Sequence, residues 1–363
     1  MSSYIYKRVQ VGDNPSMDMQ QKLNSPNIPR MKLSVIDVSK PEKQTLQPLL
    51  EAATQQGFLL IDGHGFTQSE VDELFTICKR FFTGTDHEEK LKYPIDQRNF
   101  GYSSFDAENL NPNRSTDYKE SFNFSQINFV NGAVNQTPNY ELNKYDSANP
   151  IPPFFSERMD FLSQIIIKLH TQARHITKLL SMAMGVEDVN FFLKRFEPSE
   201  PSPSTFRMLR YPLVRPDSTG KTDPHVRAGA HTDYGALTLL FQREGEQGLQ
   251  LQLDGHNWTD VEFVPSKHEG MAPPLVVNFG DMMSYWTNGV LKSTMHRVRF
   301  EPGQTRDSDR YSIVFFFEPT VTTKLVPVPC QLVQTQKTKT NTGPEMTSLE
   351  YLIKKLEATY KFT

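Results

Sequence analysis

From Pro203 onward the chain consists of short β-prone runs, and this pattern limits the possible fold more than any other feature. Runs rich in Val, Leu, Phe and Thr alternate with clusters of Gly, Pro and Asp. Many short strands separated by turns are typical of β-sandwiches and barrels. We therefore predict strands near 205–211, 237–242, 249–253, 275–279, 295–300 and 311–318.

The first half of the chain has a different pattern, in which apolar residues recur at helical spacing. Helices are predicted near 44–56, 68–82 and 154–184, with strands at 33–38 and 58–61 and an amphipathic closing helix at 348–360. Residues 94–150 are too long for a plain loop, so they are predicted to be functional or to form short strands. The expected fold class is mainly β with surrounding helices.

One segment of the β half has the residue types of a metal site. His231 and Asp233 are separated by one residue. In an extended segment, residues i and i+2 point to the same face, so both side chains could reach one metal ion. His296 enters a later β-type run. Two His and one carboxylate form the facial triad of non-haem Fe(II) oxygenases, which leaves room for a co-substrate and O₂. A zinc hydrolase could use the same residue types with a bound water.

A third segment favours the iron site over the zinc site. The predicted strand near 311–318 is preceded by Arg310, and Ser312 follows two residues later. Period two places the guanidinium and the hydroxyl on one face of the strand. A guanidinium binds a carboxylate bidentately, and a hydroxyl adds a third hydrogen bond. This pair would suit the distal carboxylate of a dicarboxylic acid whose other end chelates iron.

The order of these segments resembles the isopenicillin N synthase-like, 2-oxoglutarate- and Fe(II)-dependent dioxygenases. The resemblance covers about residues 30–320. It is carried by the three segments above and by several further stretches: Gly57–Phe66, Arg210-Tyr211-Pro212, Gly248-Leu249-Gln250, Val277–Asp281 and Trp286–Gly289.

The resemblance implies a distorted double-stranded β-helix, or jelly roll, with helices packed outside. It implies that His231, Asp233 and His296 bind Fe(II), that Arg310 and Ser312 bind the C5 carboxylate of 2-oxoglutarate, and that Tyr211 lies in the same pocket. No catalytic residue is expected beyond the metal ligands. The expected reaction is hydroxylation, desaturation or cyclisation of a small organic molecule by O₂, with release of succinate and CO₂. Ascorbate is expected as the reductant.

Two other activities that would use the same metal-site residues stay open. The first is an oxidase of the same fold that uses O₂ without 2-oxoglutarate, and the remote second is the zinc hydrolase. Asn278 is predicted to satisfy a turn, and Lys119 and Glu120 are candidates for lining the substrate pocket.

The resemblance and the sequence pattern divide the chain into four parts that are expected to form one compact unit. Residues 1–30 are a polar, mobile leader. Residues 31–150 form an N-terminal dioxygenase block. Residues 151–320 form a helix and the jelly-roll core, with the ligands in 203–320. Residues 321–363 form a C-terminal segment with the closing helix.

Composition and net charge limit the classes of partner that we expect. The net charge of −3 gives no reason to expect a nucleic acid or a membrane surface as partner. Two Cys are too few for a disulfide framework or a cysteine metal site, which fits a reducing compartment. The N-terminus has no apolar signal region and the chain has no long apolar run. We therefore expect a cytoplasmic enzyme with small-molecule partners, whose oligomeric state the sequence leaves open.

Overall fold

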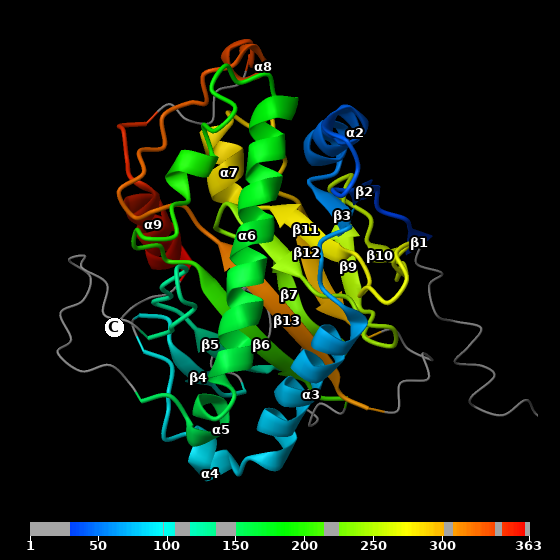
Figure 1. Ribbon diagram of the computed structural model, residues 1–363, viewed down its shortest axis with the longest axis vertical. Coiled ribbons are helices and arrows are strands. Elements are labelled where there is room, and N and C mark those ends of the chain that lie inside the picture. The colour runs from blue at the N-terminus through cyan, green and yellow to red at the C-terminus, as the bar shows by residue number, and fades with distance from the viewer. Residues whose placement is uncertain are drawn as a thin grey trace, which may run out of the picture.

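Two β-sheets face each other in the computed structural model, which describes residues 30–96, 98–105, 117–135, 150–213, 225–300, 308–337 and 343–359 (Figure 1). The large sheet has the order β2 (Val35–Asp37), β3 (Phe58–Asp62), β11 (Leu275–Phe279), β8 (Leu237–Leu240), β13 (Arg310–Phe317), β6 (Thr205–Tyr211), β5 (Glu120–Phe124) and β4 (Gly101–Ser103). The small sheet has the order β1 (Arg30–Met31), β10 (Thr259–Val261), β9 (Leu249–Gln252), β12 (Met295–Arg299) and β7 (Val226–His231). The predicted jelly roll with flanking helices is confirmed.

Side chains of the large sheet alternate between two cores. On β13, Phe315 and Phe317 point outward into the main apolar core, whereas Val314 and Phe316 point inward. The inward side chains meet Ala228 of β7 and Val298 of β12, so the two sheets pack face to face. This period-two alternation decides which polar residues of the large sheet enter the interior of the jelly roll.

Helices cover the outer face of the large sheet. The long helix α6 (Met159–Ala183) crosses in front of the strands in Figure 1, and α2 (Glu42–Gln55) and α3 (Gln68–Gly84) lie beside it. Shorter helices are α4 (His87–Lys90), α5 (Pro153–Ser156), α7 (Asp281–Trp286), α8 (Gln331–Gln334) and the C-terminal α9 (Ser348–Thr359), with one 3₁₀ turn, η1 (Leu193–Arg195). Among the described residues, no helix is both long and apolar enough to span a membrane.

Most predicted elements are present within a few residues, and the differences have local causes. The helix predicted at 154–184 is two helices, because the chain turns at Arg158 and lets Phe155 pack against Phe81, Phe122 and Phe124. The elements that were not predicted are all short: the strands β1, β7 and β10, the helices α4, α7 and α8, and the 3₁₀ turn η1. Residues 94–150 were predicted to be functional or to form short strands. The described part of this region contains the short strands β4 and β5. The predicted leader lies outside the described residues apart from Arg30.

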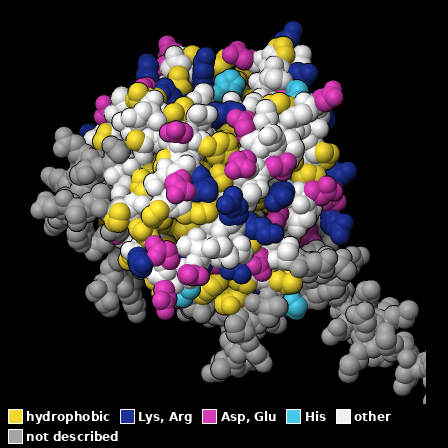
Figure 2. Space-filling model, turned by 60° about the horizontal axis from the view of Figure 1, so that its bottom comes forward, with side chains coloured by type: hydrophobic (Ala, Val, Ile, Leu, Met, Phe, Trp, Pro, Cys, Tyr) yellow, Lys and Arg dark blue, Asp and Glu magenta, His cyan; other side chains and the backbone are white. Residues whose placement is uncertain are grey.

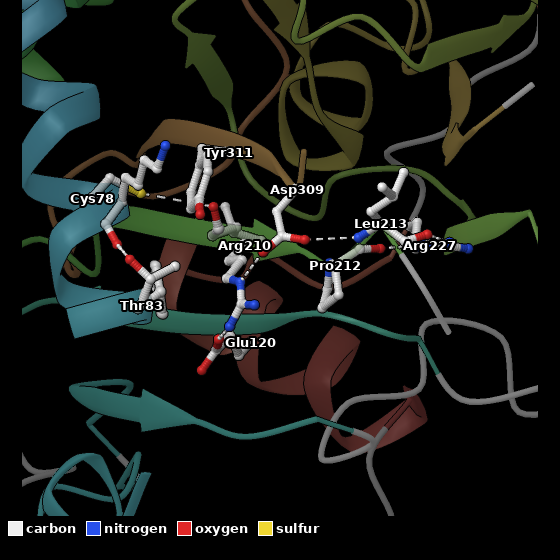
Figure 3. A network of polar contacts seen from close by, with 12 residues as sticks. Cys78, Thr83, Glu120, Arg210, Pro212, Leu213, Arg227, Asp309 and Tyr311 are labelled. Atoms are coloured by element: carbon white, nitrogen blue, oxygen red, sulfur yellow. Dashed lines mark hydrogen bonds and ion pairs between the residues drawn. The ribbon is translucent and has the colours of Figure 1, made fainter. Parts of the chain in front are cut away.

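A buried ionic network joins the N-terminal strands to the core (Figure 3). The Glu120 carboxylate is fully buried and accepts hydrogen bonds from Lys90 Nζ at 2.8 Å, Tyr102 Oη at 2.6 Å and Arg210 Nη1 at 2.7 Å. Arg210 Nε also donates to Asp309 Oδ2 at 2.6 Å. Removal of one partner would leave a buried charge uncompensated, which strongly destabilises a folded protein. The network therefore holds β5 against β6. Glu120 therefore points away from the interior, and it does not line a pocket inside the jelly roll.

One face of the molecule is mixed in charge. On the face shown in Figure 2, Lys and Arg side chains lie among Asp, Glu and hydrophobic side chains. This agrees with the near-neutral net charge of −3.

Candidate metal centre

Two of the three predicted metal ligands are cross-strand neighbours. His231 is the last residue of β7, and His296 pairs with it in register on β12. Residues directly opposite in an antiparallel pair share a face, and the two imidazole centroids are 4.3 Å apart. The sheet therefore sets the spacing of the two rings.

Asp233 comes from a loop and not from a strand. The expected extended segment ends at His231, and β8 begins only at Leu237. The loop nevertheless directs Asp233 Oδ1 toward both rings, at 3.6 Å from His296 Nε2 and 3.9 Å from His231 Nε2. The three ligand atoms lie within 4.8 Å of one another, which suits a shared metal ion.

The loop is held by the turn that starts α7. Asp281 N donates to the Asp233 carbonyl at 2.7 Å, and Gly280 N donates to the Ala236 carbonyl at 3.1 Å. A Cβ added to Gly280 would lie 2.2 Å from the Gly235 carbonyl oxygen, so only glycine permits this approach. The backbone of one turn thus positions the only carboxylate of the triad.

The second oxygen of Asp233 is occupied by two donors. Thr238 Oγ1 and Asn278 Nδ2 each donate to Asp233 Oδ2 at 2.7 Å. The prediction that Asn278 satisfies a turn is therefore wrong, because Asn278 is in β11 and faces the interior. The sequence signal was its position in an apolar strand, where a lone amide needs a buried partner. With Oδ2 bound in this way, Oδ1 is left for the metal.

Both imidazoles are oriented by backbone carbonyls. His231 Nδ1 lies 2.7 Å from the Gly229 carbonyl oxygen, and His296 Nδ1 lies 3.1 Å from that of Thr294. A proton on each Nδ1 leaves the lone pair on Nε2, the atom that faces Asp233. Metal-bound histidines usually donate their other ring N–H in this manner.

The three side chains shift one another's pKa values. Burial and the adjacent His296 lower the pKa of His231 to about 4, which keeps that ring neutral at pH 7. Burial lowers the pKa of His296, but the adjacent Asp233 carboxylate outweighs it and raises that pKa above its usual value. Burial would raise the pKa of Asp233, but the neighbouring His296 holds it well below its usual range. The cluster is thus an anionic carboxylate beside imidazoles, a donor set that suits Fe(II).

Arg310, Ser312 and Tyr211 lie on the same inner face of the large sheet. Arg310 pairs in register with Tyr211, and its guanidinium carbon lies 5.1 Å from the centre of that ring. Arg310 Nε donates to the Glu246 carbonyl at 2.7 Å, whereas its buried Nη1 has no hydrogen-bond partner among the described residues. A buried guanidinium N–H without a hydrogen-bond partner is suited to binding a carboxylate such as that of 2-oxoglutarate.

Family models match both parts of the chain. Residues 203–319 match the 2OG-Fe(II) oxygenase superfamily. Residues 28–145 match an N-terminal domain described for the non-haem dioxygenase in morphine synthesis. The first match contains every predicted site residue, from Tyr211 to Ser312.

Relatives match along most of the chain. A 2-oxoglutarate-dependent dioxygenase of Didymella fabae is 30% identical over 288 residues, which cover 78% of this chain and 82% of that protein. Homoarginine-6-hydroxylase 2-ODD-C23 of Glycine max is 27% identical over 321 residues, with coverages of 85% and 86%. The crystal structure of a full-length Neurospora crassa protein in complex with alpha-KG superposes with a TM-score of 0.70 at 25% identity, and covers 90% of this chain and 96% of that one. The chain belongs to the 2OG-Fe(II) oxygenase superfamily, as a non-haem iron oxidoreductase of the isopenicillin N synthase-like type.

Proposed function

We propose that this enzyme oxidises a small organic molecule with O₂ while converting 2-oxoglutarate to succinate and CO₂. His231, Asp233 and His296 hold Fe(II), and Arg310, Ser312 and Tyr211 bind 2-oxoglutarate. The observation that carries this proposal is the buried Arg310 Nη1, which has no hydrogen-bond partner among the described residues and lies on the inner face of the jelly roll.

The protein groups have separate tasks in this reaction. Bound iron supplies the O₂-dependent redox chemistry that side chains lack. Thr238 and Asn278 orient Asp233 so that one carboxylate oxygen is available as a ligand. Arg310 binds the distal carboxylate of 2-oxoglutarate and thereby fixes the direction in which the co-substrate approaches the metal. The apolar side chains between the sheets, among them Val298 and Val314, exclude water from the reacting groups.

Among the three outcomes we favour hydroxylation, because the relative from Glycine max is named a homoarginine-6-hydroxylase. Desaturation and cyclisation share the same oxidant and differ only in how the substrate is held. Ascorbate is proposed as the reductant that restores Fe(II), and the cytoplasm as the compartment.

The test is Fe(II)-dependent turnover of labelled 2-oxoglutarate by protein purified without oxygen. We expect labelled succinate and CO₂, and loss of both when a chelator removes the metal. Oxidation of a substrate without 2-oxoglutarate would instead support the same-fold oxidase. Full activity of the zinc-loaded protein in hydrolysis would support the zinc hydrolase.

A further inference from the structure

The side chain of Asp281, the first residue of α7, contacts both segments that carry the proposed metal ligands. Its Oδ2 accepts a hydrogen bond from Thr232 Oγ1 at 3.2 Å, and Thr232 lies between His231 and Asp233 in the chain. Its Oδ1 accepts a hydrogen bond from Ser293 Oγ at 2.6 Å, three residues before the proposed ligand of β12. One carboxylate therefore joins the Asp233 loop to the segment that leads into β12.

The backbone of Asp281 acts on the same loop as its side chain. Asp281 N donates to the Asp233 carbonyl at 2.7 Å, next to the Thr232 hydroxyl that the carboxylate accepts. Asp281 thus holds two successive residues of the loop by different groups. The backbone bond does not depend on the side chain, so a substitution at Asp281 isolates the contribution of the carboxylate.

A lysine of the C-terminal helix α9 reaches this carboxylate. Lys355 Nζ donates to Asp281 Oδ2 at 2.7 Å, and the two side chains are 35% and 17% exposed. Charge-assisted hydrogen bonds of this length are stronger than neutral ones, and partial burial shields the pair from solvent. Lys355 Nζ also lies 5.9 Å from the ring centre of Tyr234, the residue after Asp233. A single cation therefore connects α9 to the metal loop.

The position of α9 is fixed by contacts other than this ion pair. Ser348, at its first turn, is fully buried and donates from Oγ to the Thr320 carbonyl at 2.7 Å. The rings of Tyr351 on α9 and Tyr285 on α7 have centroids 5.1 Å apart. These contacts place Lys355 beside Asp281, so the lysine is held ready for the carboxylate.

We propose that Asp281 is a positioning residue of the metal centre, and that Lys355 fixes its carboxylate from the C-terminal helix. Asp281 acts on the ligands through Thr232 and Ser293, and it sets the spacing between the Asp233 loop and β12 that one Fe(II) ion requires. The proposal rests on the proposed function, because it concerns the Fe(II) site of the same reaction. Changes in groups that orient metal ligands typically cost about 10- to 100-fold in metal affinity or activity.

Positioning and simple charge predict opposite results for Lys355→Met. If only charge mattered, removal of a nearby positive charge would strengthen the binding of a divalent cation. If Lys355 holds the Asp281 carboxylate in place, its removal weakens Fe(II) binding. Thr232→Val combined with Ser293→Ala tests the same point without a change of charge, because it removes only the two hydroxyl donors.

The experiment measures the Fe(II) affinity of metal-free wild type and variants by competition with a chelating dye under anaerobic conditions. We expect Lys355→Met and the double variant each to bind Fe(II) about tenfold more weakly, Asp281→Asn at least as weakly, and Lys355→Arg nearly as tightly as the wild type. The matched control is Lys354→Met, which removes the exposed neighbouring lysine of α9.

A spectroscopic readout separates a displaced metal site from a destabilised fold. The visible absorption of the Co(II)-loaded protein depends on coordination geometry. We expect the spectrum of the double variant to differ from that of the wild type, and the spectrum of Lys354→Met to match it. Urea denaturation of the metal-free proteins shows that each variant is folded.

The outcomes separate this inference from the proposed function. Wild-type Fe(II) affinity in the double variant, or unchanged or tighter binding in Lys355→Met, would overturn the positioning role. Both variants are informative even if Asp281→Asn fails to fold. A wild-type protein that binds Fe(II) but never consumes 2-oxoglutarate would count against the proposed function alone.

Discussion

Asp233 shows how strongly single side chains determine this site. Its backbone lies in a loop, yet hydrogen bonds from Thr238 and Asn278 fix one oxygen while the other faces the two imidazoles. Arg310 is held in a similar way: its Nε donates to a backbone carbonyl, and its buried Nη1 has no hydrogen-bond partner among the described residues. In both cases neighbouring groups determine which atom is available for chemistry.

Asp233→Ala should abolish Fe(II)-dependent turnover and weaken Fe(II) binding by about 100-fold or more, because two imidazoles alone leave the metal site incomplete. Metal affinity is measured by competition with a chelating dye under anaerobic conditions. Asp72→Ala, on the exposed side of α3, serves as the control. Retained iron affinity in Asp233→Ala would mean that another carboxylate is the ligand.

Arg310→Lys should raise the KM for 2-oxoglutarate about 10- to 100-fold, because an ammonium group cannot reproduce the bidentate guanidinium contact. Steady-state kinetics at saturating substrate gives the value, and Arg174→Lys provides the matched control. An unchanged KM would exclude Arg310 as the anchor of the distal carboxylate.

At the scale of elements, the metal centre depends on how two turns pack together. The loop between β7 and β8 carries Asp233, and the turn before α7 presses its backbone against that loop at Gly280. The other two proposed ligands, His231 and His296, are on regular strands whose pairing sets their positions. The loop is therefore the part of the site most sensitive to small changes in packing.

Gly280→Ala should displace the Asp233 loop, because the new Cβ would lie 2.2 Å from the Gly235 carbonyl oxygen. We expect at least a tenfold loss of Fe(II) affinity, roughly the effect of disturbing groups around a metal ligand. Gly84→Ala is the control, since its added Cβ meets nothing within 4 Å. If both variants bound iron as the wild type does, the proposed role of Gly280 would be wrong.

At the scale of the whole molecule, stability depends on how buried charges are compensated. Glu120 is surrounded by three donors. Glu318 is also buried, but its carboxyl receives only the Ala236 N–H at 3.2 Å among the contacts that the described residues make. Burial raises the pKa of Glu318 to about 8. The folded protein therefore keeps this carboxyl protonated at neutral pH.

Glu318→Gln should stabilise the metal-free protein by a margin that grows from pH 5 to pH 8. Above its ordinary pKa the Glu318 carboxyl loses its proton in the unfolded chain but retains it in the folded chain. The contribution of this group to wild-type stability therefore falls by up to about 1.4 kcal/mol per pH unit until the folded pKa is passed. Glutamine stays neutral and avoids this loss. Urea denaturation at several pH values measures the difference, with Glu73→Gln on α3 as an exposed control. A constant difference across this range would show that Glu318 does not titrate in this way.

The sequence predicted most of the fold, because apolar periodicity and turn residues are local signals. Strands such as 205–211 and 275–279 have the predicted bounds. It did not predict β7 as a separate strand or the loop position of Asp233, since both depend on packing against a turn far along the chain. The hydrogen bond from Asn278 to Asp233 was missed for the same reason. The facial arrangement of the triad was predicted, because its residue types and their order are visible in the sequence.

The pairing of β3 with β11 has a consequence for how the chain folds. Phe58 of β3 pairs with Asn278 of β11, and Arg30 of β1 pairs with Asp260 of β10. Both N-terminal strands therefore pair with strands that are synthesised much later. Such long-range pairing slows folding, because a large loop must close before the contacts form. During translation the apolar strand β3 remains without its main partner until most of the chain has emerged. Nascent chains halted before β11 should therefore be the species that bind chaperones most strongly.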